Sequence, residues 1–196
     1  MRHANKMYLR GVPSDGRESS DRGRLARQSS GRTEMAVPRF LPAAIDQVTW
    51  HARRGHGIVL VSGTLAPLAD EIAVALVVRL AVRGIAASVG VCATSLEEKG
   101  GRWTGRIVGD AMFGEAKARA VRRIAAEGQF DLPKCYAYGN CMNDRWMLEA
   151  VGRPVAVNPS KRMEALARRR GWAILAWAEK NTRTIDSGDE SEKVIA

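Results

Sequence analysis

Cysteine, histidine and long apolar runs are all scarce in this 196-residue chain, and each scarcity excludes a class of protein. Three cysteines, an odd number, exclude a disulfide-stapled scaffold and favour free thiols in a reducing compartment, so a cytoplasmic location is expected. The longest apolar stretch, residues 72–82, contains Arg79 and is too short to span a bilayer, so no membrane insertion is expected. The polar start has no apolar core of the kind that marks a secretory signal.

Acidic side chains are also in the minority, because 21 Asp and Glu stand against 31 Lys and Arg and leave a net charge of +10. Such an excess is typical of nucleic-acid-binding proteins, and residues 161–170 are especially basic. The alternative is a solvated surface, which we favour for the basic helix, so nucleic acid is not the expected partner. An apolar content of 45% and a charged content of 27% indicate a globular chain of one domain.

Three segments differ in composition. Residues 1–36 are rich in Gly, Pro, Ser and Arg and show little apolar periodicity, which is typical of a loop, a frayed helix or disorder. Residues 179–196 are polar and predict a flexible tail. Residues 37–178 between them carry the regular apolar patterns and predict the folded core.

Apolar patterns within 37–178 alternate between strands and helices. A helix is predicted from Pro42 to about Gly55, a buried strand over 58–61, and a second helix whose stripe is Leu68, Ile72, Leu76 and Leu80. Further strands are predicted over 86–92, 136–138, 155–157 and 174–177, a hairpin strand over 103–108, and helices over 115–126, 143–151 and 163–170. This alternation predicts an α/β fold with a mostly parallel sheet flanked by helices.

Polar clusters follow three of the predicted elements, and ligands of open α/β sheets bind beyond the carboxyl ends of strands. The first cluster, Ser62-Gly63-Thr64, follows the strand over 58–61. It predicts either an anion site at a helix N-terminus or a simple helix cap. In the second cluster, Lys117 lies in the first turn of a helix, where its charge is unfavourable unless it faces an anion; a solvated surface lysine is the alternative.

The third cluster runs from Tyr138 to Asp144 after a predicted strand. Gly139 permits a tight turn there, and Asn143 and Asp144 supply an amide and a carboxylate. An Asx turn with a helix cap is the alternative. Cys141 is a conceivable thiol nucleophile, but it lacks a base nearby in sequence. His51 and His56 lie elsewhere and are expected to be polar surface residues.

Taken in order, Val61-Ser62-Gly63, Gly114-Glu115-Ala116-Lys117 and Tyr138-Gly139-Asn140 with Asn143-Asp144 resemble a known motif series. They are similar to motifs two, three and four of the haloacid dehalogenase (HAD) superfamily, closest to its phosphoserine-phosphatase-like branch, subfamily IB. Further similar segments are 103–109, 147–152, 155–159 and 171–175, so the resemblance covers about residues 37–178. It implies a Rossmann-like core that hydrolyses a small phosphomonoester, such as a phosphoserine-like metabolite, with Mg²⁺.

The resemblance also implies roles for individual residues. Ser62 with the Gly63 N–H would bind the phosphoryl oxygens, Lys117 would neutralise their charge, and Asn143 would contact phosphate. Lys117 and Asp144 would be the catalytic residues, and Asp144 would lie in the metal shell with Asn140. These roles agree with phosphoryl-transfer chemistry, which depends mostly on positioning and charge stabilisation.

The sequence departs from this family in two places. The family's first motif, a strand followed by Asp-x-Asp-x-Thr, occurs nowhere, and neither Asp15 nor Asp46 has its context. Residues 7–12 resemble the helical cap that follows this motif, so the chain is expected to be truncated at its N-terminus, starting inside the cap. Asn140 stands where the family has a metal-binding Asp, so weak or no Mg²⁺ binding is expected.

From these departures we expect the chain to have no appreciable phosphatase turnover. The alternatives are a non-catalytic protein that binds phosphorylated ligands and, from another class, a basic nucleic-acid-binding protein. In the family the missing strand lies between the strand that ends at Ser62 and the strand that ends at Gly139. We expect these two strands to close the gap by pairing directly, with poor solubility as a consequence.

Overall fold

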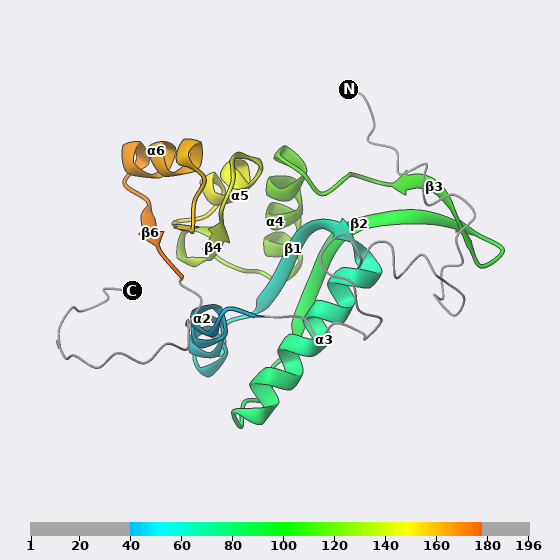
Figure 1. The fold of residues 1–196 in the computed structure, drawn as a ribbon, viewed down its shortest axis with the longest axis horizontal. Coiled ribbons are helices and arrows are strands. Elements are labelled where there is room, and N and C mark those ends of the chain that lie inside the picture. The colour runs from blue at the N-terminus through cyan, green and yellow to red at the C-terminus, as the bar shows by residue number, and fades with distance from the viewer. Residues whose placement is uncertain (1–39, 178–196) are drawn as a thin grey trace, which may run out of the picture.

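The computed structural model describes residues 40–177 and has the predicted α/β architecture (Figure 1). The predicted terminal segments 1–36 and 179–196 lie outside the described residues. In chain order the elements are α2 (Pro42–Arg53), β1 (Ile58–Leu65), α3 (Ala66–Val82), β2 (Val89–Lys99), β3 (Arg102–Val108), α4 (Glu115–Glu127), η2 (Leu132–Lys134), β4 (Tyr136–Gly139), η3 (Met142–Asp144), α5 (Arg145–Glu149), β5 (Arg153–Val157), α6 (Lys161–Arg170) and β6 (Ala173–Leu175).

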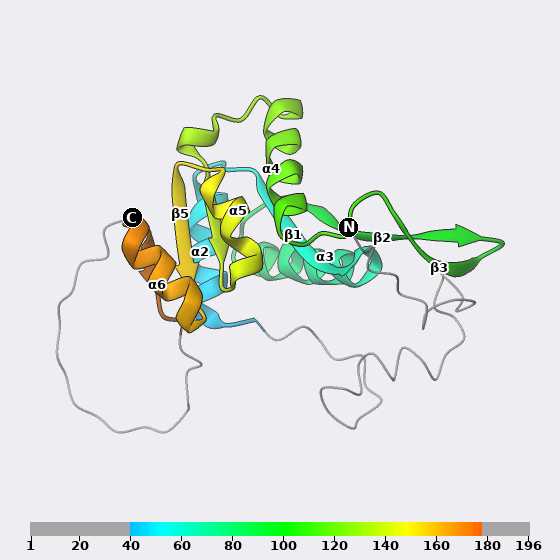
Figure 2. The same cartoon turned by 90° about the horizontal axis from the view of Figure 1, so that it is seen from above.

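The strands form two three-stranded sheets, in the orders β1-β2-β3 and β4-β5-β6. β1 pairs with β2 in parallel, and β3 folds back on β2 as an antiparallel hairpin that projects from the body (Figures 1 and 2). The second sheet is parallel throughout. The predicted parallel arrangement with one hairpin is therefore confirmed, but it is divided between two sheets.

The expectation that β1 and β4 pair directly is wrong. Within residues 40–177, β1 pairs only with β2 and β4 pairs only with β5. Side chains join the two sheets instead. Val61 of β1 packs against the core of the second sheet, and α2 sends Gln47 and His51 to the hydroxyl of Tyr138 on β4. These bulky contacts hold the facing strand edges apart, so their backbones do not meet.

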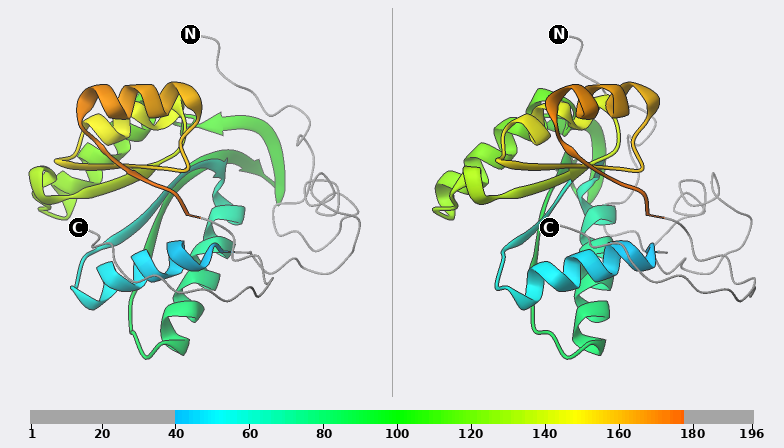
Figure 3. Two further views of the ribbon diagram at one scale, coloured as in Figure 1. Left: turned by 60° about the vertical axis from the view of Figure 1, so that its left-hand side comes forward. Right: turned by 90° about the vertical axis from the view of Figure 1, so that its left-hand side faces the viewer.

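The main core lies between the second sheet and the helices α5 and α6, which Figure 3 shows lying on that sheet. Its fully buried members are Leu148, Ala156, Met163 and Ala167. The predicted basic helix over 163–170 is thus half apolar. Two of its arginines form ion pairs with Glu164 and Glu149, which neutralises part of the charge that suggested nucleic-acid binding.

The stripe predicted for α3 is only half right. Leu76 and Leu80 are buried, but Leu68 is 38% exposed, and Ala69 and Ala73 take the sheet-facing positions instead. Alanine has the smallest apolar side chain, so it lets the helix approach β1 and β2 closely. None of the described helices, α3 included, is long and apolar enough to cross a membrane. All three cysteines lie in the described part of the chain and are free thiols.

Candidate functional site

Ser62, Gly63 and Thr64 lie within β1 rather than after it. The pairing with β2 passes from Ser62 opposite Ala93 to Leu65 opposite Thr94, so Gly63 and Thr64 form a bulge. The hydroxyl oxygen of Ser62 accepts a hydrogen bond from the bulge N–H of Thr64 at 3.2 Å. The N–H donor beside Ser62 thus belongs to a strand bulge and not, as predicted, to the N-terminus of a helix.

The alternative prediction, a helix cap, is wrong. The residue before α3 is Leu65, and no side chain caps this helix. A bulge is a common way to aim a side chain at a site beside a sheet, because it bends the strand and leaves residues unpaired. The Ser62 segment therefore does not serve to start α3.

Two residues that the motifs did not indicate hold this bulge. Thr94 is fully buried, and its hydroxyl donates to the carbonyl of Gly63 at 3.2 Å while accepting the N–H of Met112 at 3.1 Å. The Phe113 ring lies against Gly63, where an added Cβ would be 2.5 Å from the ring. A side chain at position 63 would therefore have to displace the Phe113 ring, which is 47% exposed. Neither residue belongs to a motif, so no sequence signal indicated this role.

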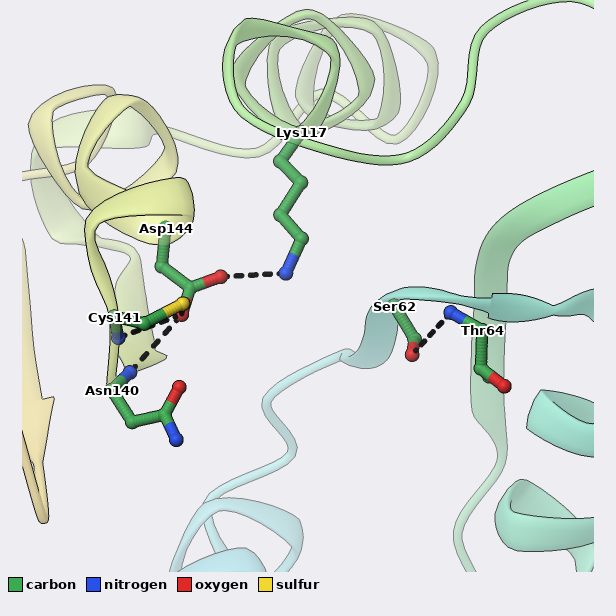
Figure 4. Close-up of polar contacts among 6 residues, drawn as sticks. All are labelled: Ser62, Thr64, Lys117, Asn140, Cys141 and Asp144. Carbon is green, nitrogen blue, oxygen red and sulfur yellow. Dashed lines mark hydrogen bonds and ion pairs between the residues drawn. The ribbon is translucent and has the colours of Figure 1, made fainter. Parts of the chain in front are cut away.

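Lys117 reaches from α4 into the space between the ends of β4 and β1 (Figure 4). The helix begins after Gly114, whose φ of 56° and ψ of −127° suit only glycine. The ammonium lies 2.6 Å from an oxygen of Asp144, and the two side chains are only 12% and 7% exposed. The prediction that Lys117 faces an anion is confirmed in part, because the anion in this structure is the Asp144 carboxylate.

Asp144 is enclosed by the turn that follows β4 (Figure 4). One carboxylate oxygen accepts the Lys117 hydrogen bond. The other accepts the N–H groups of Asn140 and Cys141 at 3.1 and 3.2 Å and the Cys141 thiol at 3.4 Å. Gly139 is needed for its size, since an added Cβ there would lie 2.6 Å from the Cβ of Asp144.

The environment of Asp144 stabilises its ionised form. Burial would by itself raise the pKa of this carboxyl, but several interactions outweigh burial and lower the pKa below the ordinary value of 3.8. They are the hydrogen bond and positive charge of Lys117 and the backbone N–H groups of Asn140 and Cys141. The carboxylate therefore stays charged wherever the chain is folded near neutral pH.

This lowered pKa makes a prediction for acid stability. A group whose pKa is lower in the folded state stabilises the fold above its unfolded pKa, and that contribution is lost as the pH falls through the folded value. Asp144→Asn should therefore have a lower free energy of unfolding than the parent near neutral pH. As the pH falls from about 5 to about 3, the free energy of unfolding should decrease less in the variant than in the parent. Urea denaturation across this range measures both, with the exposed Asp110→Asn as control. Parallel pH curves for parent and Asp144→Asn would contradict the assignment.

The two asparagines are more open than Asp144. Asn140 is exposed, and its amide is turned toward the space between the ends of β4 and β1 (Figure 4). Asn143 is exposed in the short helix η3, and neither amide group forms a side-chain hydrogen bond within residues 40–177. Both amides are therefore available to a ligand, whereas Asp144 is not.

The described residues do not fit a magnesium ion. They contain no group of three or more His, Cys, Asp or Glu side chains that could hold a metal. Asp144 has both oxygens engaged by donors, and an ammonium already neutralises its charge. Mg²⁺ sites depend on carboxylates, and Asn140 supplies only a neutral oxygen.

Cys141 and the histidines occupy different places. The Cys141 thiol donates a hydrogen bond to Asp144, and no described histidine contacts it, so the structure gives no support to a thiol nucleophile. The expectation that both histidines are polar surface residues is wrong for His51. Its ring packs against aromatic side chains and is hydrogen-bonded to the hydroxyl of Tyr138, because α2 lies beside β4.

Comparison with known proteins agrees with this geometry. The sequence model described as haloacid dehalogenase-like hydrolase matches residues 1–149. The chain is 39% identical over 124 residues to "Phosphoserine phosphatase SerB1" of Mycobacterium tuberculosis, which covers 63% of this chain and 37% of the relative. This chain thus spans well under half the length of that relative.

Solved structures show the same fold. A protein of unknown function from Bordetella pertussis matches with a TM-score of 0.62 at 30% identity, covering 81% of this chain and 67% of the other. A probable phosphoserine phosphatase from Vibrio cholerae matches with a TM-score of 0.61 at 18% identity, covering 88% and 45%. The second likeness concerns the fold alone.

Proposed function

Because the chain belongs to the haloacid dehalogenase-like hydrolase family and is phosphoserine-phosphatase-like, we propose that its described residues bind the phosphoryl group of a small phosphomonoester. The observation that carries the proposal is Lys117, a largely buried ammonium aimed between the ends of β1 and β4 (Figure 4). An ammonium has three N–H donors, and Asp144 takes one of them. The remaining donors suit an oxyanion.

Ser62 and the bulge complete the binding groups. The hydroxyl of Ser62 donates to a phosphoryl oxygen, and the N–H of Gly63, held by Thr94 and Phe113, donates to another. Asp144 keeps Lys117 in place and remains ionised, and the Asn143 amide is open for a further contact. Charge-assisted donors of this kind are the strong ones for phosphate.

We propose that this chain binds without turning substrate over. Asp-x-Asp-x-Thr is absent from the sequence, and among residues 40–177 the carboxylate at this site is Asp144, which Lys117 and two N–H groups occupy. Phosphatases of this family generally use Mg²⁺, but the donors present here do not fit that ion. A phosphoserine-like metabolite is the proposed ligand class, following the relative's name. A cytoplasmic location remains a prediction, and the free thiols support it.

The expected result of an anion titration is a small stabilisation. Phosphate or vanadate at about ten times its dissociation constant adds about 1.4 kcal/mol, and this raises the melting temperature by about 3 °C. Ser62→Ala should reduce the shift, while Ser95→Ala, at an exposed position of β2, should leave it intact. The double variant Lys117→Gln with Asp144→Asn removes both buried charges together and should abolish it. No shift at millimolar anion, or equal shifts in all variants, would refute the proposed site.

A DNA titration at several salt concentrations tests the alternative that the chain binds nucleic acid. Binding of DNA through basic residues falls steeply with salt, whereas a buried phosphoryl site is screened much less. We expect the chain to show no DNA binding that weakens with salt and requires Arg169, an exposed residue of α6. Tight DNA binding lost in Arg169→Gln would favour the alternative.

A further inference from the structure

The turn after α2 brings two imidazole rings into contact, away from the site described above. His51 lies in the last turn of α2, and Gly55, with a φ of 70°, turns the chain back behind it. The N–H of His56 then donates to the carbonyl of His51 at 3.2 Å, and the Nδ1 atoms of the two rings lie 2.9 Å apart. This contact is a hydrogen bond, so one ring carries a proton on Nδ1 and the other does not.

Neighbouring hydrogen bonds decide which of the two rings donates. The hydroxyl of Tyr138 accepts a hydrogen bond from the Gln47 amide at 2.9 Å and lies 2.8 Å from Nε2 of His51. Burial raises the pKa of Tyr138 to about 12, so the hydroxyl keeps its hydrogen and donates it to Nε2. A neutral imidazole has one donor and one acceptor nitrogen, so His51 donates from Nδ1 to Nδ1 of His56. The four groups form one chain in which each donates to the next, and His56 accepts at its end.

The inner ring of this pair resists a positive charge. Burial, followed by the charges of His56 and Arg54, lowers the pKa of His51 to about 4. The Arg54 guanidinium lies over the Trp50 ring, at 3.9 Å from its centroid, which keeps that charge beside the pair. His51 therefore stays neutral in mildly acidic solution and remains the donor to its partner.

The other charged groups around the pair supply no counter-charge. The Arg153 guanidinium of β5 lies over the ring of Tyr136 and adds a further positive charge on this side of β4. The Asp46 carboxylate of α2 is paired with Arg83 of α3. Within residues 40–177, no ion pair joins either imidazole to a carboxylate. An added proton is therefore expected on the exposed outer ring, where water solvates the charge.

We propose that His51 and His56 form a pH-sensitive switch, which holds the turn after α2 against β4 while His56 is neutral and releases it when His56 takes up a proton. The proton binds Nδ1 of His56, where it faces the Nδ1–H of His51, and two N–H groups cannot share a hydrogen bond. Because His56 is exposed, its ring then turns into solvent and leaves the stacked ring of Tyr136, 6.3 Å away between centroids. His51 stays neutral and bonded to Tyr138.

The pH range of the switch follows from this competition. A freely solvated imidazole has a pKa near 6.5, so the released form gains a proton only below about that pH, and the closed form prevails above it. The inner ring stays neutral until about pH 4, so release of the outer ring is the change expected between these two values. His56 lies two residues before β1, so the switch controls whether the start of β1 is held beside β4. The proposal does not depend on the phosphoryl site.

The test is NMR of the chain labelled with ¹⁵N at histidine, in a His3→Ala background that leaves only this pair of the three histidines. At about pH 7.5 we expect His51 to carry its proton on Nδ1 and none on Nε2. At about pH 5 we expect an imidazolium at His56 and loss of its ring contact with Tyr136, while His51 is still neutral. Solid-state spectra of the hydrated protein give these signals whatever the association state of the chain.

Two variants separate the hydrogen bond from ring packing. His56→Phe keeps an aromatic ring beside Tyr136 but has no nitrogen to protonate, so its ring contact should be the same at both pH values. Arg53→Gln, an exposed position at the end of α2, should leave the response of the parent unchanged. Circular dichroism checks that both variants keep the fold.

Two results would overturn the proposal. A proton on Nε2 of His51 at about pH 7.5 would show that the chain of hydrogen bonds runs the other way, with His56 as the donor. A contact between His56 and Tyr136 that persists unchanged from about pH 7.5 to about pH 4.5 would show that protonation releases nothing.

Discussion

Incubated with phosphoserine or p-nitrophenyl phosphate and Mg²⁺, the chain is expected to release no phosphate above the uncatalysed rate. Family phosphatases accelerate this chemistry through an aspartate nucleophile, and this sequence has no Asp-x-Asp-x-Thr segment to supply one. The expected loss of phosphatase activity is large, because a site without a nucleophile stabilises the bound substrate as much as the transition state and so does not accelerate the reaction. Colorimetric phosphate release, followed with and without Mg²⁺, measures it directly.

A matched pair of variants guards this result against contamination. Ser62→Ala removes the proposed binding hydroxyl from β1, and the control Ser95→Ala removes an exposed hydroxyl of β2 that lies outside the proposed site. If turnover is found and is lost only in Ser62→Ala, the chain itself is catalytic and the prediction fails. Lys117→Ala is the less useful variant, because leaving the Asp144 charge buried and unpaired costs about 3–5 kcal/mol and threatens the fold.

Association of the chain through the inner edges of its two sheets is the second large effect expected. Within residues 40–177, one edge of β1 and one edge of β4 have no strand partner. Exposed strand edges of this kind pair with other chains.

A single charge should oppose this association. Val59 of β1 is 38% exposed, and Val59→Lys places a lysine on the strand, as natural edge strands do. We expect the parent to elute as a range of oligomers and Val59→Lys to shift toward monomer. Val74→Lys is the control, since Val74 is 63% exposed on α3 and far from either edge in sequence. A parent that is monomeric and melts cooperatively, or equal rescue by both variants, would contradict the edge argument.

Elements with a strong local signal were predicted closely. Helix α4 was expected over 115–126 and spans Glu115–Glu127, and the β3 hairpin was expected over 103–108 and spans Arg102–Val108. Glycines and apolar periodicity mark both, and these signals act over a few residues. The strand β2 was expected over 86–92 and spans Val89–Lys99, because its limits depend on pairing with β1 and β3 and not on its own composition.

The motif residues were also recognisable in order along the chain, but their contacts were not. Lys117 and Asp144 are 27 positions apart, and only packing of α4 beside the turn after β4 shows that each neutralises the other. Thr94 and Phe113 carry no motif, and their role appears when β2 and the start of α4 close on the Gly63 bulge.

Local sequence pattern was thus enough for the α/β class and the helices, since periodicity and turn glycines are properties of short segments. The motif residues were identified by their order along the chain and their resemblance to the family. Tertiary packing decided that β1 and β4 stay apart, that Asp144 is held by Lys117, and that His51 meets Tyr138. These outcomes depend on which distant segments come into contact, and the free energy of such contacts comes from burial and pairing across the whole fold.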